Sequence, residues 1–321
     1  MVTGEDRSHE TGATTLARPR AKAGRWGILS LLLTGLASGV VGLSAQVPAS
    51  AVEGREVIMV TGSTGGLGRA VALMLAGPGT HIIVHGRNVE RGQAVVQEAE
   101  AQGSTARFIQ ADLGSFAQVR GLAAIVSRDY DRLDFLVNNA GIGRGHDGAP
   151  REVSADGYEL RFAVNYLSHF LLTRELLPLL RAGAPSRIVN VSSAAQGGGV
   201  IDFDDVMLES EPYQGGRAYA QSKLAQVFMT FDMAEELAGT GVTTNAVHPG
   251  GYLDTSMISE RGLTANMSAE EGATFVINAA RSPEAGQYFN TMNVARANDQ
   301  AYDMEARRQL RELSMELAGL D

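Results

Sequence analysis

The sequence predicts an α/β fold built on a single doubly wound parallel sheet with helices on both faces. Short apolar runs of strand length alternate with helix-length segments from Glu56 onward, which is typical of parallel strands joined by crossover helices. A glycine-rich turn, residues 61–68, follows the first apolar run. No second compositional block and no internal repeat interrupts this alternation. We therefore expect one domain after the N-terminal segment.

Each predicted strand is a short run of apolar residues, as expected for a strand that is buried on both faces. The predicted strands are residues 57–60, 81–84, 107–110, 135–137, 187–191 and 244–247. Helices are expected between them, because these longer segments carry helix-forming residues. The predicted helices are a stretch ending at 76, then 89–101, 116–130, 155–180 and 218–238.

Composition excludes several classes of protein. The chain has 321 residues, of which 44% are hydrophobic, and this is ample for a large core. Its formal net charge is −9, whereas nucleic-acid binding needs clustered Lys and Arg, so we expect no nucleic-acid partner. There are no cysteines, which removes disulfides, thiolate metal ligands and a cysteine nucleophile.

The first 51 residues differ from the rest. Basic residues gather within 18–25, an uncharged apolar stretch covers 26–45, and a pattern of small residues ends at Ala51. These are the parts of an export signal, and a stretch of about 20 apolar residues is also long enough to cross a bilayer. Three interpretations stay open: a signal cleaved after Ala51, an uncleaved membrane anchor, and an overextended gene start or disordered tail. The location of the protein depends on which interpretation is correct: the protein would be exported or membrane-anchored in the first two, and cytoplasmic in the third. The folded domain is predicted over 52–321.

The glycine-rich turn predicts a dinucleotide site. Gly62 permits a tight exit from the strand, Gly66 lets the backbone approach a pyrophosphate, and Gly68 brings the helix close to the sheet. The first N–H groups of the following helix then face the phosphates. The alternative is a loop that is merely rich in glycine.

Tyr219 and Lys223 lie four residues apart in a predicted helix and hence on one face. A tyrosine titrates near ~10 in water, which is too high for efficient proton exchange at neutral pH. An adjacent ammonium group favours the phenolate and lowers that pKa. Such a pair is common by chance; this one follows the predicted strand 187–191, whose end carries the serines at 192 and 193.

The spacing Thr-Gly-x-x-x-Gly-x-Gly at 61–68, together with this Tyr/Lys pair, resembles the short-chain dehydrogenase/reductase family, whose sheet is of the Rossmann type. Three further phrases resemble its retinol dehydrogenase-like branch, namely residues 162–172, 241–244 and 248–250. The resemblance covers roughly 55–321, with a final strand expected at 286–289 and a closing helix at 305–317. It implies an oxidoreductase that interconverts an alcohol and a carbonyl, with a lipophilic substrate favoured.

The resemblance also implies roles for single residues. Tyr219 would transfer the hydroxyl proton, Ser193 would bond the substrate oxygen, and Lys223 would hold the nicotinamide ribose. Asn165 would hold a water that relays protons from Lys223, and its alternative is a buried polar residue bonded to a helix carbonyl.

The cofactor is predicted to be NADP(H) rather than NAD(H). Relatives that prefer NAD place an acid after the second strand, whereas residues 85–88 contain none. Arg87, assisted by Arg69, would instead pair with a 2′-phosphate; the alternative is that either arginine is a solvated surface charge. The predicted cofactor-binding residues are Gly62, Ser63, Thr64, Gly66, Leu67, Gly68, Arg69, Arg87, Asp112, Leu113, Asn138, Ala140, Tyr219, Lys223, Pro249, Gly250 and Thr255.

The histidines near the predicted strand ends have no predicted catalytic or metal-binding role. His248 is expected to pack at a strand end rather than act as a base, and no metal site is expected, because His81 and His85 lack a suitably spaced carboxylate. Alternative functions are a 3-ketoacyl or polyketide-type reductase and a non-catalytic NADP(H) sensor. A homo-oligomer is expected from the resemblance, and residues 26–45 offer a possible membrane contact.

Overall fold

The computed structural model describes residues 52–146, 148–210, 212–259 and 262–320. They contain one eight-stranded sheet in the order β3-β2-β1-β4-β5-β6-β7-β8. The predicted doubly wound sheet is confirmed, and β1 to β7 run parallel. The last pairing, β7 with β8, is antiparallel. The strands are β1 (Glu56–Val60), β2 (Thr80–Gly86), β3 (Thr105–Gln110), β4 (Phe135–Asn138), β5 (Ser186–Val191), β6 (Val242–His248), β7 (Tyr288–Asn290) and β8 (Asn293–Val294).

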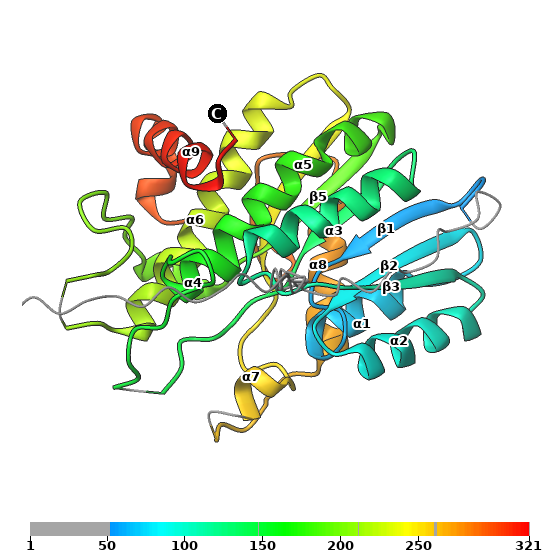
Figure 1. The fold of residues 1–321 in the computed structure, drawn as a ribbon, viewed down its shortest axis with the longest axis horizontal. Helices are drawn as coiled ribbons and strands as arrows, with labels where there is room; N and C mark the ends of the chain where they lie inside the picture. The colour runs from blue at the N-terminus through cyan, green and yellow to red at the C-terminus, as the bar shows by residue number, and fades with distance from the viewer. Residues whose placement is uncertain (1–51, 147, 211, 260–261, 321) are drawn as a thin grey trace, which may run out of the picture. The chain divides into compact units, whose positions relative to one another are not determined.

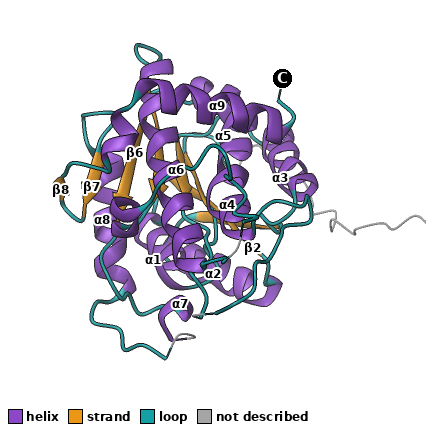
Figure 2. Cartoon of the chain, turned by 90° about the vertical axis from the view of Figure 1, so that its left-hand side faces the viewer, coloured by secondary structure: helices purple, strands orange, loops and turns teal. Residues whose placement is uncertain are grey.

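Helices cover both faces of the sheet, as Figures 1 and 2 show. One face packs on α1 (Gly66–Leu75), α2 (Val89–Ala101) and α8 (Ala269–Arg281). The other face packs on α3 (Phe116–Asp129), α5 (Ser168–Ala182) and α6 (Gly215–Glu236), and α9 (Met304–Ala318) packs against α6.

The alternation of side chains along a strand produces the two cores. Val57 and Met59 of β1 join the core beneath α3, α5 and α6. Ile58 and Val60 join the core beneath α1, α2 and α8. Burial on both faces explains why the strand reads as a continuous apolar run rather than an alternating pattern.

The predicted helix over 155–180 is wrong at its start. Residues 153–159 form a turn closed by an antiparallel bridge between Val153 and Glu159, with Gly157 at a φ of +88°. The helical segment begins with α4 (Leu160–Phe162), where the Glu159 side chain accepts a hydrogen bond from the backbone of Phe162. It continues through the π-helical turn η2 (Ala163–Leu167) into α5.

The sequence interpretation also missed some elements. They are the short helix α7 (Ser256–Ser259), helix α8, the 3-10 turns η3 (Ala194–Gly198) and η4 (Asp299–Tyr302), and strand β8. Helix α8 carries a complete capping box, in which Ser268 and Glu271 bond each other's backbone. That pattern is a sequence-level signal for a helix start. The three interpretations of residues 1–51 concern a segment outside the described residues, and the domain boundary after residue 51 stays a prediction.

Candidate active site

The strand order reverses between β1 and β4, and open α/β sheets bind ligands in the crevice beyond such a point. The glycine turn leaves β1 there, with Gly62 at a φ of +65° and Gly66 at +52°. A Cβ on Gly62 would lie 2.8 Å from the Ala140 Cα, and one on Gly68 would overlap the Gly62 carbonyl oxygen. Among the residues that the structure describes, no side chain caps the N-terminus of α1. The turn therefore leaves free backbone N–H groups in a cradle that only glycine permits, which fits a pyrophosphate.

Ser63 and Leu67 turn their side chains away from this cradle. Ser63 is buried, and its hydroxyl donates to the Val60 carbonyl and accepts from the His85 backbone N–H. Leu67 packs into the core beneath α1. Contact between these two residues and a cofactor would therefore run through their backbone. Thr64 is half-buried, and its side chain lies against Gly86, where an added Cβ would be 2.6 Å from Thr64 Cγ2.

His85 supports the same turn. The Gly62 N–H donates to its Nδ1 over 3.2 Å, so this nitrogen carries no proton. Burial lowers the pKa of His85 to about 4, which keeps the ring neutral. His85 is thus a structural acceptor. The described residues contain no group of three or more His, Cys, Asp or Glu side chains suited to a metal ion.

The structure separates the two arginines predicted near the adenosine ribose. Arg87 follows β2, its side chain is 73% exposed, and its Nη1 lies 3.8 Å from the Asp112 carboxylate. Arg69 forms an ion pair with Glu98 of α2. Arg87 and Asp112 are therefore brought together at the edge of the crevice, while Arg69 is held by another partner. Leu113 is buried in the core.

The segment after β4 fastens the glycine turn. Asn138 is fully buried, and its amide donates to Thr173 and Asn190, so its side chain braces the sheet rather than facing the crevice. Asn139 donates to the Thr61 carbonyl over 2.8 Å. The Ala140 N–H donates to the Thr61 hydroxyl over 3.0 Å. Asn139 therefore has the bracing role expected of the Asn138-Asn139 pair from the sequence, whereas the structural role of Thr61 was not predicted.

A buried histidine, also missed from the sequence, links this turn to Asn165. His169 Nδ1 lies 3.1 Å from the Asn165 carbonyl oxygen, and its Nε2 lies 3.1 Å from the Thr61 hydroxyl. A carbonyl only accepts, so Nδ1 carries the proton and Nε2 accepts from Thr61. Burial lowers the pKa of His169 to about 3, which keeps this arrangement neutral.

Asn165 lies in the π-helical turn η2, a feature that often marks functional sites. Its Nδ2 donates to Ser222 over 3.0 Å and to the Ile142 carbonyl, and its Oδ1 accepts from the Ile142 N–H. A Cβ on Gly141 would lie 3.1 Å from Asn165 Oδ1 and 3.6 Å from Lys223 Nζ. Asn165 and Lys223 therefore flank the same glycine.

Lys223 and Tyr219 lie together on α6. The ammonium of Lys223 is 5.8 Å from the centroid of the Tyr219 ring. It donates to the Val191 carbonyl and to Gln226 Oε1, over 2.8 and 2.9 Å. Burial lowers the pKa of Lys223 to about 7. Tyr219 itself is half-buried.

The two serines after β5 differ in environment. Ser192 is buried, and its hydroxyl donates to the Lys223 carbonyl over 2.8 Å. Ser193 is half-buried, and its hydroxyl accepts from the Ala195 N–H at the start of η3. Within the described residues, therefore, the Ser192 hydroxyl proton is used inside the protein, whereas that of Ser193 has no protein acceptor.

The segment after β6 reaches across to the glycine turn. A Cβ on Gly66 would lie 3.0 Å from Thr255 Cγ2, while the Thr255 hydroxyl donates to the Leu253 carbonyl. Pro249 is buried, and Gly250 has a φ of +101°. His248 ends β6 with its Nδ1 buried and without a partner in the described part of the chain.

Lys223→Met is expected to change how stability depends on pH. The pKa of Lys223 lies below its ordinary 10.5, so the unfolded chain binds more protons between about pH 7 and 10.5 and wild-type stability rises across that window. Below pH 7 the cost of the buried charge is fully present. The stability of Lys223→Met relative to wild type should therefore be highest near about pH 6 and decline toward about pH 10. Urea unfolding across this range measures it; a difference independent of pH would contradict the shift.

Comparisons with known proteins identify the family of the chain. The model of the family described as short chain dehydrogenase matches residues 56–266. Human Retinol dehydrogenase 13 is 34% identical over 295 residues, covering 85% of this chain and 88% of its own length. A crystal structure of an uncharacterized protein from Mycobacterium paratuberculosis has a TM-score of 0.69 and 26% identity, covering 86% of this chain and 98% of that one.

An NADP-bound structure is also similar. The 3-oxoacyl (acyl-carrier-protein) reductase from Agrobacterium tumefaciens has a TM-score of 0.59 and 25% identity, covering 76% of this chain and 96% of that one. The family match spans the glycine turn, Asn165, Ser193 and the Tyr219/Lys223 pair. The chain belongs to the short-chain dehydrogenase/reductase family of oxidoreductases, in its retinol dehydrogenase-like branch.

Proposed function

We propose that the protein is an NADP(H)-dependent oxidoreductase that interconverts an alcohol and a carbonyl on a lipophilic substrate. The observation that carries the proposal is the grouping of Tyr219, Lys223 and Asn165 beside the glycine turn, with Lys223 and Asn165 flanking Gly141. A proton donor, a buried cation and a cofactor cradle thus meet at one crevice.

Tyr219, Ser193 and Lys223 each have a separate role in the proposed reaction. The nicotinamide cofactor, when bound, supplies or takes the hydride. Tyr219 gives its hydroxyl proton to the carbonyl oxygen during reduction and takes it back during oxidation. Ser193 donates a hydrogen bond to the same oxygen. The ammonium of Lys223 favours the Tyr219 phenolate, because an opposite charge nearby lowers a phenol's pKa.

NADP(H) is the proposed cofactor because of the end of β2. That position carries Arg87, and residues 85–88 include no acid that would hold a ribose hydroxyl. The guanidinium of Arg87 is exposed beside Asp112, where it is available to a 2′-phosphate. The NADP bound to the similar 3-oxoacyl reductase supports the same choice.

Arg87→Ala is expected to weaken NADPH binding about tenfold, since a hydrogen bond to a charged group contributes about 1.5–3 kcal/mol and Arg87 is exposed. NADH, which lacks the 2′-phosphate, should bind unchanged. Fluorescence titration with both nucleotides measures this. Arg296→Ala is a matched control, because Arg296 is similarly exposed and pairs with Asp299 near the end of β8. Equal losses for NADPH and NADH would refute selectivity through Arg87.

The lipophilic substrate is supported by similarity to Retinol dehydrogenase 13, whose name denotes an apolar alcohol. Apolar groups also border the crevice: Ile142 is partly buried beside Asn165, and a Cβ on Gly143 would lie 3.0 Å from Met257 of α7. A 3-oxoacyl substrate is the second candidate, supported by the similar reductase.

The test begins with titration of the purified protein by NADPH and NADH. Tight, NADPH-selective binding followed by NADPH oxidation on addition of long-chain aldehydes supports the proposal. Oxidation with 3-oxoacyl thioesters but not with aldehydes favours the second candidate. Absence of binding to either nucleotide would overturn both.

Two further parts of the proposal concern partners. We propose a homo-oligomer and a membrane contact through residues 26–45, a segment outside the described residues. Helix α9 covers part of α6 through the ion pairs Arg311–Asp232 and Arg307–Glu235. In the described part of the chain, no helix has the length and apolarity needed to cross a bilayer.

A further inference from the structure

A buried charged cluster lies one helical turn before Asn165. Arg161 is 3% exposed and Glu159 is fully buried. The Arg161 Nη1 donates to the Tyr213 hydroxyl over 2.9 Å, and that hydroxyl donates to Glu159 Oε1 over 2.8 Å. Burial and the Glu159 carboxylate raise the pKa of Tyr213, so the phenol keeps its proton. The three side chains form one continuous chain of donors and acceptors.

The cluster joins segments that are distant in sequence. Arg161 Nε donates to the Gly143 carbonyl over 2.9 Å, in the loop that leaves β4. A Cβ on Gly145 would lie 2.8 Å from Arg161 Nη2. A Cβ on Gly215, the first residue of α6, would overlap the Arg144 carbonyl oxygen. The loop after β4 and the start of α6 thus pack closely around one guanidinium.

Both segments lead directly to the proposed catalytic groups. Tyr219 lies four residues after Gly215 on α6. Ile142, next to Gly143, exchanges two hydrogen bonds with the Asn165 side chain. Asn165 in turn donates to Ser222 of α6. A shift of either segment would therefore move Tyr219 relative to Asn165.

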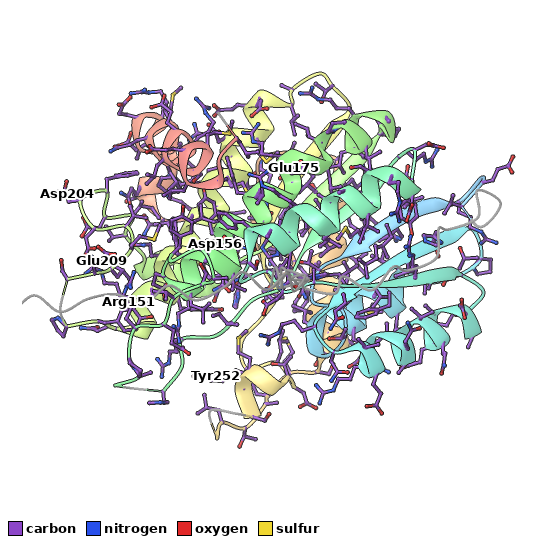
Figure 3. The ribbon with its side chains drawn as sticks, viewed as in Figure 1. Arg151, Asp156, Glu175, Asp204, Glu209 and Tyr252 are labelled. Atoms are coloured by element: carbon purple, nitrogen blue, oxygen red, sulfur yellow. The ribbon has the colours of Figure 1, made fainter. Side chains whose placement is uncertain are left out.

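A second arginine, Arg151, also links two segments that precede helices of this region. Arg151 Nε donates to the Met207 carbonyl over 2.8 Å, and its Nη2 lies 3.7 Å from Glu209. Figure 3 shows Arg151 and Glu209 on the same side of the molecule. Arg151 thus ties the segment before α6 to the segment before α4, but it does not reach Gly143.

We propose that Arg161 is a positioning residue, which with Tyr213 and Glu159 holds the loop after β4 against the start of α6 and so fixes Tyr219 relative to Asn165. The effect on turnover rests on the proposed function. The mechanical effect on the two segments does not depend on it.

The test uses two variants of the full-length protein. Tyr213→Phe removes only the bridging hydroxyl, and Arg161→Lys keeps the charge but loses the planar fork of donors. Both are expected to lower kcat about 10- to 100-fold at temperatures well below their Tm, because small displacements of catalytic groups cost that much. The Kd for NADPH should change much less than kcat, because the hydrogen bonds of Asn139 and Ala140 to Thr61, which fasten the glycine turn, involve neither substituted residue.

Arg307→Lys is the matched control. Arg307 is also buried, and it pairs with Glu235 near the far end of α6. We expect this variant to lower Tm while leaving kcat unchanged. A kcat that is unchanged in both Tyr213→Phe and Arg161→Lys would overturn the proposal, as would an equal fall in Arg307→Lys.

Hydrogen exchange separates this inference from the proposed function. Arg161→Lys should speed amide exchange in 141–146 and 212–219, whereas Arg307→Lys should not. If wild type turns over no carbonyl substrate, the proposed function fails and the exchange result alone decides the role of Arg161. Unchanged exchange in both segments would then overturn it.

Discussion

Tyr219→Phe is expected to lower kcat about 10²- to 10⁴-fold, the range that a positioned general acid or base contributes. The phenyl ring preserves packing on α6 but has no proton to exchange with the substrate oxygen. Lys223, which we expect to hold the nicotinamide ribose, is not altered, so the Kd for NADPH should be nearly unchanged. Single-turnover oxidation of NADPH in the presence of a carbonyl substrate measures the loss.

Tyr130→Phe provides the control for this prediction. Tyr130 is buried, and its hydroxyl lies 2.9 Å from His81 Nε2, so its removal also deletes a buried hydrogen bond. We expect lower stability and unchanged kcat in this variant. Activity surviving in Tyr219→Phe would show that another group transfers the proton.

Gly68→Ala is expected to lower the free energy of unfolding by about 1–3 kcal/mol or more, the usual cost of forcing an extra methyl into a filled site. The added methyl overlaps the Gly62 carbonyl oxygen and the Asn139 amide. Because Gly62 is backbone, relief requires the glycine turn to shift. NADPH affinity should therefore fall together with stability.

Gly121→Ala separates this clash from helix propensity. Gly121 lies in α3, and an added Cβ there meets no atom of the described residues within 4 Å. Alanine should stabilise that helix by up to about 1 kcal/mol with no effect on NADPH binding. Thermal unfolding and nucleotide titration of both variants measure the contrast. Equal stability of the two variants would show that α1 and the glycine turn are not packed as described.

The sequence alone predicted β1 to β6 and most helices, because their signals are local. The strands that contain Ile58 and Val189 are buried, and each is visible in the sequence as a short apolar run. The start of α2 is visible as Asn88, which caps the helix that begins at residue 89. The start of α4 was misjudged, since the turn closed by the bridge between Val153 and Glu159 depends on contacts within the folded loop.

The glycine turn and the Tyr219/Lys223 pair could also be predicted from the sequence. At Gly62 and Gly68 the backbone lies close to other backbone atoms, whereas a Cβ on Gly66 would meet the Thr255 side chain. The i, i+4 spacing likewise places Tyr219 beside Lys223 once the helix forms.

Tertiary structure alone decided which side chains face the crevice and which brace it. Ser63 and Asn138 turn inward to satisfy buried backbone and amide groups, and Arg69 is held by Glu98. Arg161 and Tyr213 are 52 residues apart, and their hydrogen bond exists only because two long segments meet beside α6. Local patterns specify elements, whereas hydrogen bonds between distant segments depend on how those elements pack, and so only the folded chain determines them.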